Sequence, residues 1–368
     1  MVSNITEGVP VMRPQLPDAE AILPYLRQID AARRYSNDGP LVRRLGSRIA
    51  AHFKVAEDEV ALVANGTVGL TLGLRATGAV AGGRCLVPAW SFSATAHAIL
   101  GAGLVPYFLD VEPSSWSLTP QIARQALADG VGDVAAVMPV MPFGRPLDLA
   151  AWDAFSDETG IPVVVDAAAG FDSLVPAYGP TVLSLHATKV FGIGEGGVVI
   201  CRDANYVGNI RRLANFGFTA DRQSAVPATN AKMSEYAGAV GLARFDTWPI
   251  VRDASRALAK RYIDAAANHA GVQFMPGFGA WATSTCVAML GERGADSVAQ
   301  SLELGGIESR RWWGDGCHRQ PAFADCQSGP LPVTDMLSAV ALGLPFYPEL
   351  DDAMINRVLE TATGAGEG

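Results

Sequence analysis

The feature that most constrains the fold is an alternation of short apolar runs with amphipathic stretches of helix length. Seven runs have the length and apolar character of strands: residues 59–63, 84–88, 105–109, 134–140, 162–166, 182–185 and 197–201. Several are apolar throughout, as strands covered on both faces of a sheet must be. The alternation predicts an α/β fold with a mainly parallel sheet. Active groups are then expected in loops after the strand carboxyl ends.

The helical pattern also suggests how the chain divides into domains. Amphipathic helices are expected near residues 42–53, from Pro120 and from Asp148. After Pro249 the pattern changes to one long helical stretch followed by shorter mixed elements. We therefore expect a large α/β domain with an N-terminal arm over residues 1–249, and a small α+β domain over residues 250–368.

Composition excludes several classes of protein. A net charge of −9 argues against nucleic-acid binding, because no broad basic face is available. The five cysteines form no C-x-x-C pair, so neither a disulfide framework nor a metal site is expected. Residues 85–109 carry no charge, but their prolines and glycines argue against a membrane span. The N-terminus does not resemble a signal peptide, and we expect a cytoplasmic protein.

Two motifs that follow apolar runs could contact a cofactor. In ANGT, Gly66 and Thr67 stand at an expected helix N-terminus, where backbone amides and a hydroxyl can bind phosphate. Such a turn is also a common structural connection. In PAWSFSATA, Trp90 or Phe92 could stack on a flat heterocycle, or could belong to the core. Neither motif identifies a function by itself.

Two later motifs add ionisable groups. Asp166 ends an apolar run, as a helix cap or as the partner of a buried cation such as a protonated pyridine nitrogen. In SLHATKVFGIGEGG, Lys189 lies five residues after Ser184 and before a glycine-rich turn. A lone lysine would more often be a solvated surface residue. The order of phosphate turn, aromatic residue, aspartate and lysine, however, describes a pocket for pyridoxal 5′-phosphate (PLP).

These motifs carry a family resemblance over residues 30 to 350. The segments involved are ANGT, PAWSFSATAHAI, FLDVEP, VDAAAG, SLHATK with GEGG, NAKMSE and GLPFYPEL. Together they resemble the DegT/DnrJ/EryC1/StrS family of PLP-dependent nucleotide-sugar aminotransferases. The resemblance implies a fold-type I homodimer with a mixed, mostly parallel central sheet flanked by helices.

The resemblance also implies roles for individual residues. Lys189 would form the aldimine with PLP, and Asp166 would pair with the pyridinium nitrogen. The remaining cofactor contacts implied are ring stacking by Phe92, helped by Trp90, phosphate binding by Gly66, Thr67 and Ser184, and a contact of Asn230 with the partner's cofactor. The chain departs from the family at Ala169, where Gln or His is common, and at Met141, where His is frequent.

The implied reaction moves an amino group from L-glutamate to a nucleotide-linked keto sugar, with a 4-keto-6-deoxyhexose as the favoured acceptor. The candidate substrate residues are His186, Arg310, Arg311, Trp312 and His318. The cluster that begins at Arg310 also includes Trp313 and could bind diphosphate and stack on a base, or could instead be a domain interface.

Other functions remain open from the sequence. The same fold could serve an amino-acid transaminase, or a non-catalytic regulator that has kept the pocket. A nicotinamide oxidoreductase is disfavoured because no G-x-G-x-x-G follows the first expected strand.

Overall fold

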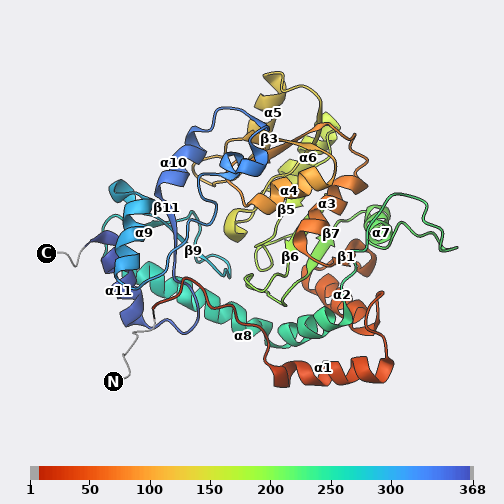
Figure 1. Cartoon of the computed structure of the whole chain (residues 1–368), viewed down its shortest axis with the longest axis horizontal. Coiled ribbons are helices and arrows are strands. Elements are labelled where there is room, and N and C mark those ends of the chain that lie inside the picture. Colours follow the sequence, from red (N-terminus) through yellow and green to blue (C-terminus); the bar gives the residue numbers. More distant parts are fainter. Residues whose placement is uncertain (1–7, 365–368) are drawn as a thin grey trace.

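The computed structural model describes residues 8–364, which form a central sheet with helices on both faces and a C-terminal α+β part (Figure 1). All seven expected strands are present: β1 Val60–Val63, β2 Arg84–Pro88, β3 Val105–Leu109, β4 Val134–Val137, β5 Val165–Asp166, β6 Thr181–Ser184 and β7 Gly197–Ile200. The helices of this region are α1 Ala19–Ala32, α2 Pro40–Phe53, α3 Gly66–Ala76, α4 Ser93–Gly101, α5 Pro120–Ala128, α6 Leu149–Thr159 and α7 Ala204–Leu213.

The central sheet has two four-stranded parts, in the orders β1-β7-β6-β5 and β10-β3-β2-β4. Strand β10 (Gln327–Ser328) comes from near the C-terminus. Isolated parallel bridges from Val137 to Val163 and from Val140 to Asp166 join the two parts. Only β7 runs antiparallel to its neighbours β1 and β6 among the described pairs of this sheet. The sheet is therefore mixed and mostly parallel, as expected.

Both faces of the sheet are buried, which explains why the strands are apolar throughout. Along β7, Val198 and Ile200 pack in one core with α2, α6 and α8 (Glu235–Ala266), whereas Val199 packs in another with α3, α4 and α7. Because successive side chains of a strand point to opposite faces, both sets of positions must be apolar.

The C-terminal part contains a three-stranded antiparallel sheet in the order β11-β9-β8. Its elements are β8 Gln273–Phe274, β9 Cys286–Met289, α9 Ala295–Leu304, α10 Pro332–Val340, β11 Ala341–Leu344 and α11 Asp352–Thr363. In the chain as a whole, short 3₁₀ helices occur at η1 Glu57–Glu59 and η2 Pro142–Gly144 in the large-sheet region, and at η3 Gly291–Arg293, η4 Cys317–Arg319 and η5 Pro321–Phe323 nearer the C-terminus.

Helix α8 (Glu235–Ala266) connects the two parts and continues through Pro249. Before Pro249, Leu242 and Trp248 pack in the core of the large sheet; after it, Leu258 and Tyr262 pack in the C-terminal core. The boundary expected at Pro249 thus falls inside one continuous helix, although the packing partners change there. The division into two domains stays a prediction.

The N-terminal arm crosses the C-terminal part before α1. The Val9 amide donates to the Gly306 carbonyl at 2.9 Å, and the Phe346 amide donates to the Val11 carbonyl at 3.0 Å. The buried Arg244 guanidinium donates to the carbonyl oxygens of Gln15 and Gly192. The arm is therefore tied to the glycine-rich turn that follows Lys189.

Among the described residues, no helix is both long enough and apolar enough to cross a bilayer. The five cysteines are free thiols; Cys326 is half-buried and the others are buried.

Candidate active site

A cavity of about 340 Å³ lies where the expected motifs come together. Its lining includes Gly66, Thr67, Phe92, Asp166, Ser184, His186, Lys189 and Trp312. Residues after the carboxyl ends of β1, β2, β4, β5 and β6 contribute to it, as expected for a sheet of this type. A separate cavity of about 270 Å³ lies beside α6, and its lining within residues 8–364 contains no lysine, arginine or histidine.

The first turn of α3 forms a corner with free hydrogen-bond donors beside Ser184. The Asn65 side chain caps this helix by accepting from the Val68 amide at 2.9 Å. The Gly66 and Thr67 amides precede the intrahelical bonds and, within the described chain, donate to no acceptor. A Cβ at Gly66 would lie 2.9 Å from Ser184 Cβ, so only glycine lets Ser184 approach the helix terminus. Free amides and a hydroxyl at this corner suit a phosphate.

Asp166 is a nearly buried carboxylate at the end of β5, with an exposed fraction of 5%. The Thr95 hydroxyl donates to one carboxylate oxygen at 2.7 Å, and the Ala168 amide donates to the other at 3.0 Å. Ser91 hydrogen-bonds Thr95 at 2.9 Å between hydroxyl oxygens. Burial raises the pKa of Asp166, while Thr95, Ala168 and Lys189 lower it. A cation in the cavity would compensate the cost of burying this carboxylate.

Lys189 lies in the connection between β6 and β7, not at a strand end. The Lys189 amide donates to the His186 carbonyl at 2.9 Å, and the Ala187 amide donates to the Gly194 carbonyl at 2.7 Å. A Cβ at Gly192 would lie 2.6 Å from the Ala187 carbonyl oxygen, so the turn needs glycine there. Burial lowers the pKa of Lys189, against the opposing effect of Asp166. A lowered pKa favours the neutral amine, which is the nucleophilic form.

His186 also lines the cavity, and its ring orientation is set by Thr188. The Thr188 amide donates to His186 Nδ1 at 3.2 Å, and the Thr188 hydroxyl oxygen lies 2.8 Å from the same nitrogen. In the neutral ring the proton is therefore on Nε2, which lies 3.7 Å from a carboxylate oxygen of Glu195. Glu195 is a second acidic group in the cavity lining.

The aromatic candidates separate into lining and core residues. Phe92 lines the cavity with 58% of its surface exposed, whereas Trp90 is buried and packs edge-on against Trp313. The Phe143 ring stacks on Trp313 with centroids 4.1 Å apart, and both line the cavity. Phe92 is thus free to contact a ligand, while Trp90 packs behind the stacked rings of Trp313 and Phe143.

Of the expected substrate cluster that begins at Arg310, Trp312 and Trp313 line the cavity, whereas the described side chains of Arg310, Arg311 and His318 do not. The Arg310 guanidinium lies over the Trp312 ring, 5.0 Å from its centroid. Arg311 forms ion pairs with Asp296 and Asp315 outside the cavity lining. His318 lies outside the lining too, beside Phe108.

Asn230 also lies away from this cavity and is exposed. The Lys232 ammonium donates to the side-chain oxygens of Asn230 at 2.7 Å and Asn215 at 2.9 Å. The expected contact of Asn230 with a partner's cofactor is not tested by one chain and stays a prediction.

Several lining residues did not emerge from the sequence motifs. They are Met12, Ser91, Thr95, Phe143, Glu195, Ser284 and Thr285. Thr95 and Glu195 lie inside motifs that were recognised for other residues. Met12 and Thr285 come from distant segments, and no local pattern marks them. Ala169 and Met141, the two departures from the family, both lie in the lining as apolar groups.

The residues present fit the chemical groups of PLP. Free amides at Gly66 and Thr67, a carboxylate at Asp166 and an amine at Lys189 share one cavity. These are the groups required by a phosphate, a protonated pyridine nitrogen and an aldehyde.

Comparison with known proteins identifies the family. The sequence model of the DegT/DnrJ/EryC1/StrS aminotransferase family matches residues 17–363. Protein MT3510 of Mycobacterium tuberculosis (strain CDC 1551 / Oshkosh) is 30% identical over 95% of this chain and 88% of its own length.

Two further relatives have informative names. A dTDP-4-amino-4,6-dideoxy-D-glucose transaminase of Shigella dysenteriae is 33% identical over 64% of either chain. The crystal structure of DesI in the presence of its TDP-sugar product superposes with a TM-score of 0.88 at 32% identity, covering 98% of this chain and 94% of DesI. The chain belongs to the DegT/DnrJ/EryC1/StrS aminotransferase family.

Proposed function

We propose that this aminotransferase uses PLP to move an amino group from L-glutamate to a nucleotide-linked keto sugar. The favoured acceptor is a 4-keto-6-deoxyhexose. The observation that carries the proposal is the shared cavity of Lys189, Asp166 and the α3 corner. The named relatives support the substrate class, because one is named as a transaminase of a dTDP-linked 4-amino sugar and the other was solved with a TDP-sugar product.

When bound, PLP would supply an electron-accepting ring for transfer of the amino group. Gly66, Thr67 and Ser184 would hold its phosphate, and Phe92 would pack on its ring. The Asp166 carboxylate would keep a proton on the ring nitrogen, and Thr95 would hold that carboxylate in its ionised form. Lys189 would bind the cofactor and, once released, carry a proton to and from the reacting carbon.

We further propose a homodimer in which the partner completes the site. Lys189 is the only lysine or arginine among the described residues that line the cavity. Both the nucleotide diphosphate and the glutamate carboxylates need positive charge for recognition. Residues of the partner, in the region of its Asn230, would contribute to each site.

The proposal is tested by incubating the protein with PLP, L-glutamate and a panel of dTDP- and UDP-linked keto sugars. Mass spectrometry should detect an amino sugar from at least one nucleotide 4-keto-6-deoxyhexose. Lys189→Ala should abolish turnover while leaving circular dichroism unchanged. Reaction with small keto acids alone would favour an amino-acid transaminase, and no reaction despite PLP binding would favour the regulator.

A further inference from the structure

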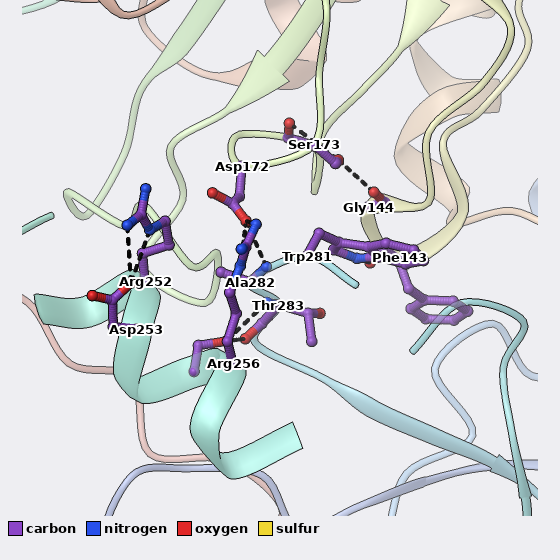
Figure 2. Close-up of polar contacts among 12 residues, drawn as sticks. Phe143, Gly144, Asp172, Ser173, Arg252, Asp253, Arg256, Trp281, Ala282 and Thr283 are labelled. Carbon is purple, nitrogen blue, oxygen red and sulfur yellow. Dashed lines mark hydrogen bonds and ion pairs between the residues drawn. The ribbon is translucent and has the colours of Figure 1, made fainter. Parts of the chain in front are cut away.

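Residues 281–285, a segment from the C-terminal part, are hydrogen-bonded to loops of the large sheet beside the cavity. Figure 2 shows residues 281–283 of this segment facing two such loops. The Trp281 indole donates to the Phe143 carbonyl at 3.2 Å, and the Ala282 amide donates to an Asp172 carboxylate oxygen at 2.7 Å. Both attachments are made by buried residues of the segment.

Asp172 is the charged centre of this attachment. Its side chain is only 6% exposed, and the same carboxylate oxygen accepts from two Arg256 nitrogens of α8, at 2.8 and 3.2 Å. Asp172 belongs to the loop that begins directly after Asp166. We call Asp172, Arg256 and Ala282 the Asp172 junction. It connects the loop that follows the cofactor carboxylate to the C-terminal segment.

A second pair of hydrogen bonds fixes the next residue. The Thr283 amide donates to the Ser255 hydroxyl at 2.9 Å, and that hydroxyl donates to the Thr283 carbonyl at 2.7 Å. Strand β9 then begins at Cys286 and is buried. Ser284 and Thr285 are therefore held between two fixed points.

Ser284 and Thr285 are half-buried and line the cavity. The Thr285 hydroxyl lies 3.3 Å from the Thr283 hydroxyl, and no described residue hydrogen-bonds the Ser284 hydroxyl. The lining also includes the side chains of Phe143, Trp312, Trp313, Met12 and Met141. The hydroxyls of Ser284 and Thr285 suit a ligand that carries hydroxyls, because each can donate and accept a hydrogen bond.

We infer that Ser284 and Thr285 select the sugar by hydrogen bonding its hydroxyl or carbonyl oxygens, and that Asp172 positions them. The inference rests on the proposed function, since it assigns residues to the sugar acceptor of that reaction. A site built to hydrogen-bond a substrate hydroxyl discriminates against ligands that lack it. We expect the amino donor to react through the same Lys189 and Asp166 without needing the Ser284 and Thr285 hydroxyls.

The test measures the two halves of the reaction separately in the intact, PLP-loaded protein. The absorbance of bound PLP reports its reaction with L-glutamate and, after that, its restoration by a dTDP-4-keto-6-deoxyhexose. Ser284→Ala and Thr285→Val should each raise the KM for the sugar by about tenfold, the effect of losing roughly 1.4 kcal/mol of hydrogen bonding. The reaction with L-glutamate should stay within about twofold of wild type.

Asp172→Asn should reproduce the effect on the sugar, because it weakens the Asp172 junction. Combining it with Thr285→Val should add little, as expected for residues that act through one another. Asp253→Asn is the matched control, because Asp253 pairs with Arg252 on the same helix at 3.0 Å but does not contact the segment. It should leave both half-reactions unchanged.

Equal losses in both half-reactions, or an unchanged sugar KM in Thr285→Val, would overturn the inference. Thr285→Val leaves the Asp172 junction intact, so this result does not depend on how Asp172→Asn folds. If wild-type protein reacts with L-glutamate but with no nucleotide keto sugar, the proposed function fails and the inference fails with it. Active wild type with unaffected variants refutes the inference alone.

Discussion

Replacing Thr95 by Val should change the pH dependence of the reaction more than it changes the fold. Valine keeps the shape of Thr95 but removes the hydroxyl that donates to Asp166 at 2.7 Å. A hydrogen bond to a charged group contributes about 1.5–3 kcal/mol, which is roughly 10- to 150-fold in the ratio of ionised to protonated carboxyl. Burial already raises the pKa of Asp166 and Thr95 opposes that effect, so the variant should raise it further.

The reaction needs ionised Asp166, so activity is lost as the pH falls through the pKa of this carboxyl. In Thr95→Val the loss should therefore occur at higher pH than in wild type. The assay is the rate of reaction of bound PLP with L-glutamate, followed by absorbance between about pH 5 and 9.

Thr334→Val provides a matched control for this experiment. The buried Thr334 hydroxyl donates to Asp110 at the same distance, 2.7 Å, outside the cavity lining. Its loss should cost comparable thermal stability without moving the pH profile. If the Thr95→Val and wild-type profiles coincide on the acid side, the reaction does not depend on ionised Asp166.

Two further predictions concern the phosphate corner and the partner subunit. Gly66→Ala places a Cβ 2.9 Å from that of Ser184 and should weaken PLP binding about tenfold or more by fluorescence titration. Gly208→Ala is the control, because a Cβ there meets nothing within 4 Å, and it should leave PLP affinity unchanged. Equal PLP affinity in both variants would refute phosphate binding at the Gly66 corner. Co-expressed Lys189→Ala and Asn230→Ala chains should regain about a quarter of wild-type activity if each site uses both subunits. Activity no higher than that of the Asn230→Ala homodimer would argue against a shared site.

The strands were predictable because burial on both faces leaves an unbroken apolar signature. Where that signature was weak, the prediction was less complete. Helix α1 was not expected; its Pro24 and largely exposed surface obscure the periodicity. Strand β5 is shorter than the apolar run 162–166, since only Val165 and Asp166 pair with β6. Local composition does not determine how far a ladder extends.

The site was predictable where function follows a strand end, and less so elsewhere. Asp166 and Ser184 lie at strand ends, and Lys189 follows soon after in the same motif. Thr285 reaches the cavity only through tertiary packing, so its position in the sequence carries no signal. Arg311 carries the positive charge expected of a residue that binds a diphosphate, but it forms ion pairs with two nearby aspartates outside the cavity lining. Which face of a loop points inward depends on those contacts.

The most direct test of the central claim is the absorbance spectrum of the protein with PLP, before and after L-glutamate. We predict a visible band that requires Lys189 and disappears on addition of L-glutamate as the amino group moves to the cofactor. A folded protein that gives no such band, or a band that persists in Lys189→Ala, would contradict the assignment of Lys189 as the residue that binds PLP.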